Sequence, residues 1–241
     1  IQSSHNTVAG QIALGMGCQG YNFTYVNSAV SFESSLLDAQ MQLENNEASN
    51  ILVGGVDELV DHHVRSHQLI RHFKTEPVTL AGVLESKTEG AIMAEGSHFF
   101  ILSNEKQDST YAELLGIDIY NKLSQEQLVG QIDSFLKDHN TPIDDVDLIV
   151  LGNNGDVNFD GYYLSLSQGL FKDTPQACFK HLSGEFDTAS AFAFWMACKI
   201  VKTQSVPKVV KFNDLEATPK TVLIYNQYRG ENHSFALLKK C

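Results

Sequence analysis

Three small residues, Asn27, Ser28 and Ala29, stand between a stretch of β-forming residues and a helical pattern. The β-formers over 21–26 predict a strand, and the apolar spacing over 30–45 predicts a helix, so the small residues form the turn between them. A side chain there lies at the positive end of the helix dipole, where backbone N–H groups can meet a developing oxyanion. This arrangement suits acyl transfer, with Ser28 as the candidate nucleophile. The alternative interpretation is that Ser28 is a small residue that fits a crowded turn.

A second set of polar residues lies in two loops of the second half of the chain. Lys180 and Glu185 precede a helical pattern over 187–203. A glutamate can act as a general base where burial raises its pKa, which a serine nucleophile would need. The other loop follows an apolar stretch over 146–151 and contains Gly152 and Asn154. Neither of these two residues can transfer a proton as an imidazole does.

Taken in order, these segments resemble the β-ketoacyl synthase family of the thiolase-like superfamily. The family pattern runs from a Gly-Pro strand through Thr-Ala-Cys into an Ala-rich helix, and then to a buried strand that ends in Gly-Gly. The same order runs here from Gly20 to Gly54 and Gly55. Aligned without a gap, the family's nucleophilic cysteine falls on Ala29, whose methyl group cannot carry a thioester. A slip of one residue would make Ser28 the nucleophile.

The later landmarks of the family are present in order but altered at the positions that the resemblance makes catalytic. The first histidine falls on Gly152 without a gap, or on Asn154 after a shift of two residues. In the Lys-x-x-x-Gly-His motif the lysine is retained as Lys180, whereas Glu185 stands at the histidine. The C-terminal loop that contributes to the oxyanion region corresponds to 226–232 and has lost most of its glycines. Loss of the nucleophile alone abolishes a covalent step.

The resemblance implies a layered α/β fold of the thiolase type, α-β-α-β-α, and a non-catalytic subunit comparable to the chain-length factors of type II polyketide systems. Such subunits pair with an active ketosynthase and shape the tunnel that limits chain growth; the setting that we favour is aryl polyene or flexirubin biosynthesis. The implied partners are an acyl carrier protein, reached directly or through the partner, and a ketosynthase-like subunit in a homodimer or heterodimer. The alternative is an active 3-oxoacyl carrier-protein synthase or acyltransferase, with Ser28 as nucleophile and Lys180 and Glu185 as polar helpers.

The resemblance also predicts how the chain is organised. Residues 1–120 would be the remainder of the N-terminal thiolase-like half, with the nucleophile turn, and residues 121–241 the C-terminal half. The first part of the N-terminal half lies outside the resemblance, so we expect a piece of a longer chain. The family pairs a strand across a two-fold axis, and here that strand would be Ser49–Val53. The predicted helices cover 7–16, 30–45, 124–139 and 187–203, and the predicted strands cover 21–26, 50–55, 90–102, 110–119, 146–151, 221–226 and 234–239.

The charge of the chain limits its partners. With 17 basic and 29 acidic residues the formal net charge is −12, which argues against nucleic acid. Acyl carrier proteins are acidic as well, so docking would need a local basic patch or a partner subunit; Lys202, Lys208 and Lys211 are weak candidates for such a patch. No secretory segment or apolar run long enough for a membrane is apparent, so we expect a cytoplasmic protein without a membrane partner.

Cysteines and histidines offer two further sites that we weigh against simpler interpretations. Cys18 and Cys178 could be displaced nucleophiles, but the four cysteines show no CxxC spacing, and reduced thiols are the simpler interpretation. His63 and His67 lie four residues apart and could ligate a metal on one helix face. No third ligand is evident, so we favour a solvated helix, no metal site and no cofactor.

Overall fold

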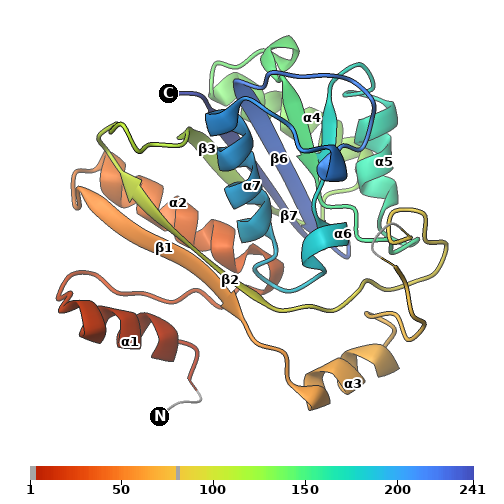
Figure 1. Cartoon of the computed structure of the whole chain (residues 1–241), viewed down its shortest axis with the longest axis horizontal. Helices are drawn as coiled ribbons and strands as arrows, with labels where there is room; N and C mark the ends of the chain where they lie inside the picture. Colours follow the sequence, from red (N-terminus) through yellow and green to blue (C-terminus); the bar gives the residue numbers. More distant parts are fainter. Residues whose placement is uncertain (1–3, 80–81) are drawn as a thin grey trace.

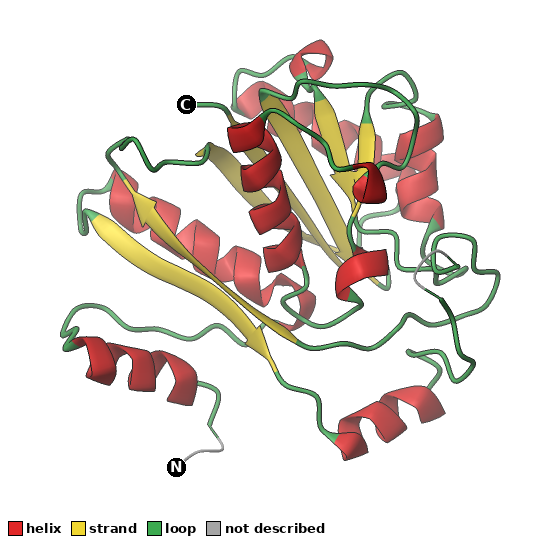
Figure 2. Ribbon diagram, viewed as in Figure 1, coloured by secondary structure: helices red, strands yellow, loops and turns green. Residues whose placement is uncertain are grey.

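The computed structural model describes residues 4–79 and 82–241, and it contains two β-sheets (Figure 1, Figure 2). The smaller sheet is an antiparallel pair, β1 and β2. The larger sheet has the strand order β3-β7-β6-β4-β5, in which β4 runs parallel to β5 and β6, whereas β7 runs antiparallel to β3 and β6. The strands are β1 (Asn50–Asp57), β2 (Gly96–Ser103), β3 (Glu113–Asn121), β4 (Leu148–Leu151), β5 (Gln176–Cys178), β6 (Thr221–Tyr228) and β7 (Asn232–Lys239).

Helices form layers between and outside these sheets. In Figure 1, α2 and α7 lie between the two sheets, and both helices contact strands of each. Helices α4 and α5 cover the other face of the five-stranded sheet, and α1 lies beside the outer face of β1. This order confirms the layered α/β fold. The α-helices are α1 (Thr7–Met16), α2 (Ser31–Glu44), α3 (Asp61–Leu69), α4 (Gln125–Asp138), α5 (Gly161–Gln168), α6 (Lys180–Ser183) and α7 (Ser190–Thr203), with short 3-10 helices at Ser28–Val30, Ile143–Asp145 and Lys208–Val210.

The apolar residues form two cores, one on each face of the five-stranded sheet. The first core lies between the sheets and includes Phe32 of α2, Phe194 of α7 and Val53 of β1. The second lies under α4 and α5 and includes Phe135 and Tyr163. Strand β4 is buried along its whole length, because a strand covered on both faces presents side chains to both cores. The two cores therefore hold the loops at the ends of β4 and β5 in place.

Most predicted elements are present with shifts of a few residues at their ends. Helix α1 matches its predicted range, and α4 begins at a capping box in which Ser124 accepts from the Gln127 N–H at 3.3 Å. The strand predicted over 90–102 begins only at Gly96, since residues 91 and 93 make isolated bridges to other segments. The helix predicted over 187–203 begins at Ser190.

The strand predicted over 21–26 is wrong. These residues are extended, but the structure assigns them no strand, and Tyr21, Phe23 and Val26 are exposed. A strand needs a neighbour that accepts and donates backbone hydrogen bonds, and no described segment forms a ladder with this one. Sequence pattern alone supplies the extended conformation but not the neighbour.

The linker over 104–112 connects the two sheets. It leads from β2, which pairs with β1, into β3, which pairs with β7 at the edge of the larger sheet. The strands on its two sides therefore do not pair with each other. Strand β3 belongs with the later strands, and a domain boundary between residues 120 and 121 stays a prediction.

Candidate functional site

Lys180 and Glu185 form a buried ion pair at the position where the sequence suggested an altered catalytic centre. Lys180 Nζ lies 2.8 Å from Glu185 Oε2, and the side chains are 0% and 2% exposed. Asn154 Nδ2 donates to the same carboxylate oxygen at 2.6 Å. The structure thus brings together three of the residues singled out from the sequence. The Lys180 ammonium and the Asn154 amide thus donate to the same carboxylate oxygen, and the hydrogen bond from the ammonium is a charge-assisted one.

Short backbone contacts fix the position of Glu185. Lys180 begins the single turn α6, and Gly184 follows with φ +71°, a conformation that disfavours residues with a side chain. A Cβ atom at Gly184 would lie 2.4 Å from the Cβ of Ala94. The backbone N–H of Glu185 donates to the Ile92 carbonyl at 2.8 Å. The retained glycine therefore lets the chain turn closely against the 91–94 segment, with Glu185 pointing inward.

The space beside Gly152 is filled by other side chains. A Cβ atom built on Gly152 would lie 2.6 Å from Asn226 Oδ1 and 2.7 Å from Tyr163 Oη. Tyr163 is fully buried and its hydroxyl donates to the Gln227 carbonyl at 3.0 Å. A histidine at position 152 would not fit without displacing these groups. Of the two alignments considered, Asn154 is the residue whose side chain reaches Glu185.

The loop over 152–160 is held in place by its own carboxylates. Asp160 accepts from the backbone N–H groups of Asn154 and Gly155 at 3.1 and 3.0 Å. Burial raises the pKa of Asp160 to about 6, although these two hydrogen bonds act in the opposite direction. Asp156 lies 3.6 Å from the guanidinium of Arg229, which also stacks over the Phe159 ring at 4.7 Å. Residues 226–232, expected as a loop, form the end of β6, a tight turn and the start of β7, and Arg229 ties this turn to the loop over 152–160.

A buried lysine that the sequence did not single out closes the same loop from the other side. Lys74 Nζ donates to the Gly155 carbonyl at 2.9 Å and to the Thr88 carbonyl and hydroxyl at 3.0 and 2.9 Å. Burial lowers the pKa of Lys74. Since Gly155 and Thr88 are 67 residues apart in sequence, only the tertiary structure could reveal this contact.

Ala29 and Ser28 occupy the start of α2 but face different surroundings. Ala29 is 2% exposed, whereas Ser28 is exposed and has φ 49°, an uncommon backbone conformation for a residue with a side chain. The Ser28 hydroxyl lies near the Asp187 carboxylate and acts to lower its pKa. Partial desolvation, followed by the charges of Asp57 and Glu185, raises the pKa of Asp187. Ser28 thus has a carboxylate neighbour, but it is Asp187 and not Glu185.

Neither cysteine considered as a displaced nucleophile takes part in the Lys180–Glu185 cluster. Cys178 is buried at the end of β5, where its thiol lies 3.5 Å from Asn153 Oδ1. Burial raises the pKa of Cys178 well above its usual range, which removes the thiolate near neutral pH. Cys18 is exposed beside α1.

The histidines of α3 pair with aromatic neighbours. His67 Nδ1 lies 3.4 Å from His72 Nδ1, and His72 lies 3.4 Å from the Tyr228 hydroxyl. His63 contacts His62. Across residues 4–79 and 82–241, no group of three or more histidine, cysteine, aspartate or glutamate side chains is arranged to hold a metal ion. No helix in the same two ranges is long and apolar enough to cross a membrane.

Two of the three lysines considered for docking are engaged with the protein's own acceptors. Lys202 Nζ donates to the carbonyls of Asp108 and Thr110 at 3.0 and 2.8 Å. Lys211 Nζ lies 2.5 Å from Glu216. Lys208 begins the 3-10 helix after α7. The ion pair with Glu216 offsets the charge of Lys211, whereas the two carbonyls hold the Lys202 ammonium against the protein without changing its charge.

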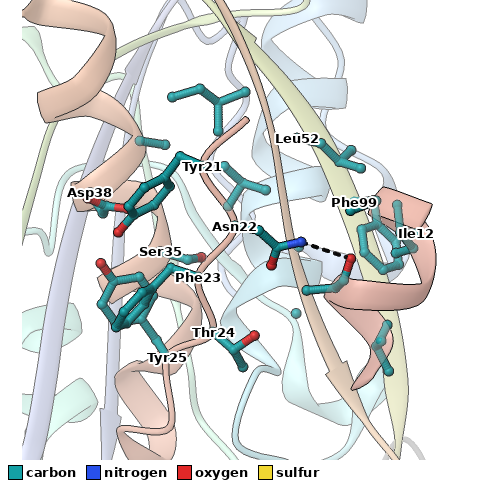
Figure 3. A pocket seen from close by; sticks show the side chains of 18 of the residues that line it. Ile12, Tyr21, Asn22, Phe23, Thr24, Tyr25, Ser35, Asp38, Leu52 and Phe99 are labelled. Atoms are coloured by element: carbon teal, nitrogen blue, oxygen red, sulfur yellow. Dashed lines mark hydrogen bonds between the residues drawn. The ribbon is translucent and has the colours of Figure 1, made fainter. Parts of the chain in front are cut away.

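A cavity of about 450 Å³ lies away from the Lys180–Glu185 cluster, between α1, the extended segment over 18–25 and strand β1. Figure 3 shows Tyr21, Phe23 and Tyr25 on the side of α2 that carries Asp38, whereas Asn22 donates to the Ala9 carbonyl of α1 at 3.2 Å. The alternation of these side chains is that of a strand without a partner. Ala29, Asn154, Lys180 and Glu185 do not line this cavity.

One buried carboxylate that sequence reasoning missed lies one helical turn beyond Ala29. Glu33 is 3% exposed, between Phe32 and Leu36 on the buried face of α2. The helical spacing of apolar residues could have revealed it, since Glu33 falls on the apolar stripe. Asp187 and Arg229 were also missed; their roles depend on contacts with distant residues that spacing does not encode.

Comparisons with solved structures place this geometry in a known fold, although no family model and no curated protein matches the sequence. The ketosynthase ApeO in complex with its chain length factor ApeC, from Xenorhabdus doucetiae, matches with a TM-score of 0.82 over 100% of this chain and 65% of that chain, at 16% identity. A complex of a type II polyketide synthase acyl-carrier protein with its ketosynthase bound to the hexaketide, AntDE:AntF, matches with a TM-score of 0.81 over 98% and 67% at 18% identity.

A β-ketoacyl synthase from Burkholderia phymatum matches with a TM-score of 0.79 over 98% of this chain and 65% of that chain, at 14% identity. The chain spans about two thirds of the length of these three structures. At these identities the likeness concerns the fold, and it agrees with the layers and strand order described above. This chain therefore has the thiolase-like fold of ketosynthases and their chain length factors.

Proposed function

We propose that this chain is a non-catalytic, ketosynthase-like subunit of fatty acid or polyketide biosynthesis that acts with an active ketosynthase, as a chain-length factor does. The observation that carries the proposal is the buried cluster of Lys180, Glu185 and Asn154, in which a carboxylate and an amide stand where the resemblance places histidines. Ala29 stands at the position where the resemblance places the nucleophilic cysteine. The amide of Asn154 cannot transfer a proton, and the carboxylate of Glu185 is bound to Lys180 and Asn154, which supports a structural role for the cluster.

The proposed partners follow from the same resemblance. Among the matched structures, one contains an acyl-carrier protein with its ketosynthase and another a ketosynthase with its chain length factor. We extend this to a heterodimer or homodimer in which the partner receives the acyl carrier protein. The net charge of −12 and the engaged lysines Lys202 and Lys211 favour docking through the partner. An aryl polyene or flexirubin pathway is the setting that we propose.

Mass spectrometry tests the absence of the covalent step. The intact protein is incubated with acyl-loaded carrier protein, alone and together with a ketosynthase encoded beside it. We expect acylation of the ketosynthase only, because Ala29 cannot form a thioester. A stable acyl adduct on this chain in the absence of the ketosynthase would contradict the proposal.

A second candidate function is acyl transfer at Ser28, and one observation favours it. Ser28 combines a left-handed backbone, in the 3-10 helix that precedes α2, with a neighbouring carboxylate, Asp187, whose pKa is raised. In this mechanism Ser28 Oγ attacks a thioester carbonyl and its proton passes to Asp187; the C–S bond then breaks to give the seryl ester, and Asp187 returns the proton to the leaving thiolate. Lys180 and Glu185, the helpers considered from the sequence, are bonded to each other inside the protein.

Two variants separate the candidates. An adduct that is lost in Ser28→Ala and strongly reduced in Asp187→Asn would support the serine mechanism. Ser35→Ala serves as the control, because Ser35 lies in α2, directly after the 3-10 helix of Ser28, and its hydroxyl donates to the Phe32 carbonyl. If no variant changes the mass spectrum because no adduct forms, the non-catalytic function holds.

The proposed dimer has its own test at β1. Leu52 is 43% exposed on this strand, which the resemblance places at the two-fold axis. We expect Leu52→Lys to weaken association with the partner or with a second copy at least tenfold, measured by analytical ultracentrifugation. Val129→Lys on α4 is the matched control, since Val129 is 39% exposed and α4 covers the face of the five-stranded sheet that points away from β1. Unchanged association of Leu52→Lys would contradict this interface.

A further inference from the structure

A small void lies in the middle layer, where α2, α7 and β7 meet. Its volume is about 10 Å³. Five apolar residues line most of it, and three polar side chains from three elements reach it: Glu33 of α2, Ser190 of α7 and Ser234 of β7. All three are almost fully buried, at 3%, 4% and 4% exposed. The void is therefore a polar pocket inside an otherwise apolar core.

Two polar atoms at this void have no hydrogen-bond partner. Ser234 Oγ donates to Glu33 Oε1 at 2.8 Å, but the second carboxylate oxygen, Oε2, is unpartnered. The hydroxyl of Ser190 is unpartnered as well. A buried polar atom without a partner is costly to the folded state, and native proteins almost always satisfy such atoms with protein groups or ordered water.

The volume of the void limits the size of the molecule that it can hold. A cavity holds one water molecule when the volume open to a water-sized probe is about 10–15 Å³ and at least two polar groups are in reach. This void meets both conditions and is too small for an organic ligand or an acyl chain. We propose that it binds one internal water molecule, which bridges Glu33 Oε2 and Ser190 Oγ.

The hydrogen-bond pattern follows if Glu33 carries a proton. Burial raises the pKa of Glu33, while hydroxyls of Ser234 and Ser190 and the charge of Lys180 act in the opposite direction. The other residues facing the void from α7, β6 and β7 are Phe194, Ile224 and Ala236, which carry no charge. The neutral acid then donates from Oε2 to the water, and the water donates to Ser190 Oγ.

The bridge would join three elements around the start of α2. Glu33 is four residues after Ala29, so the water and the Ser234 contact tie the helix that carries the vacated nucleophile position to α7 and to the five-stranded sheet. This inference concerns the internal packing of the protein, and it stands whether or not the proposed function is correct.

A crystal structure of the full chain at pH 8, at a resolution that shows ordered water, tests the proposal directly. We expect a water peak within hydrogen-bond distance of both Glu33 Oε2 and Ser190 Oγ. In Ser190→Ala we expect the peak to be lost or to move, whereas Ser35→Ala, on α2 with Glu33, should leave it in place. An empty void in the unaltered protein would overturn the proposal.

Infrared spectroscopy at pH 8 gives a second measurement in solution. A protonated carboxyl group has a carbonyl band separate from that of carboxylates. We expect this band in the unaltered protein, its disappearance in Glu33→Gln, and its retention in Asp160→Asn, because Asp160 with a pKa of about 6 is ionised at pH 8. If Glu33→Gln does not fold, the shift of the band in Ser190→Ala provides the same assignment. The absence of any such band would overturn the hydrogen-bond pattern given above.

Discussion

At the scale of single residues, the centre of this protein is organised by charges that satisfy one another. Lys180 and Glu185 are both inside the protein, and Asn154 completes the hydrogen bonds of the shared oxygen. Removing two ions from water is costly, and their attraction offsets that cost only with good geometry. A distance of 2.8 Å and a third donor supply such geometry. Replacing one member alone therefore lowers the free energy of unfolding more than replacing both members together.

This argument predicts a strongly non-additive double-mutant cycle. Lys180→Met leaves a buried carboxylate without its cation, and we expect the free energy of unfolding to fall by about 3–5 kcal/mol. The double variant with Glu185→Leu should recover most of that loss, because no buried charge remains. Urea denaturation followed by circular dichroism measures the unaltered protein, Lys180→Met, Glu185→Leu and the double variant. Additive effects of the two substitutions would show that the pair is not coupled.

At the scale of elements, the loop over 152–160 depends on one glycine. Gly155 has φ +80°, and a Cβ atom there would lie 2.4 Å from the Val83 carbonyl oxygen. Its own carbonyl accepts from Lys74, so neither the backbone nor the neighbour is free to move. The segments around Lys74 and Thr88 reach this loop through that contact. The geometry of the loop is therefore set by segments far away in the sequence.

We expect Gly155→Ala to lower the free energy of unfolding by roughly 1–3 kcal/mol, from the left-handed backbone and the contact with Val83. Gly130→Ala should instead raise it by about 0.5–1 kcal/mol, since Gly130 lies in α4 with nothing within 4 Å of an added Cβ atom. Thermal or urea unfolding of the two variants measures the sign of each change in the free energy of unfolding. A stable Gly155→Ala protein would mean that the loop adjusts more easily than its contacts indicate.

At the scale of the whole molecule, buried carboxylates link stability to pH. Burial raises the pKa of Asp160 to about 6 and also raises that of Glu33. Between the unfolded-state values, about 4, and these native values, the native state binds more protons than the unfolded state. The free energy of unfolding therefore falls as pH rises through this window.

For Asp160 the loss between about pH 4 and pH 7 is roughly 2–3 kcal/mol, from a shift of about two pKa units. We expect Asp160→Asn to show a flatter dependence on pH over this range, and to be less stable than the unaltered protein at pH 4, because one backbone N–H loses its acceptor. Equilibrium unfolding in urea at several pH values measures the slope. An unchanged slope in Asp160→Asn would assign the pH dependence to other groups.

The sequence by itself determined the order and type of most elements and the fold class. Alternation and helical spacing are local properties, which is why α1, α4, β6 and β7 were found close to their observed limits. The motif order also placed Lys180 and Glu185 near one centre, since each follows a recognisable turn or strand. Segment 21–26 has the composition of a strand, but a strand exists only when a neighbouring backbone pairs with it.

Only the tertiary structure decided which groups meet. Asn154 reaches Glu185 across 31 residues, Lys74 reaches Gly155 across 81, and Ser234 reaches Glu33 across 201. Such contacts depend on how two sheets and three helical layers pack. No local pattern of residues predicts which residues that packing brings together. The same packing fills the space beside Gly152 with Tyr163 and Asn226. The residue types of the Lys180–Glu185 cluster could therefore be identified from the sequence. Their partners, burial and protonation followed from the three-dimensional packing.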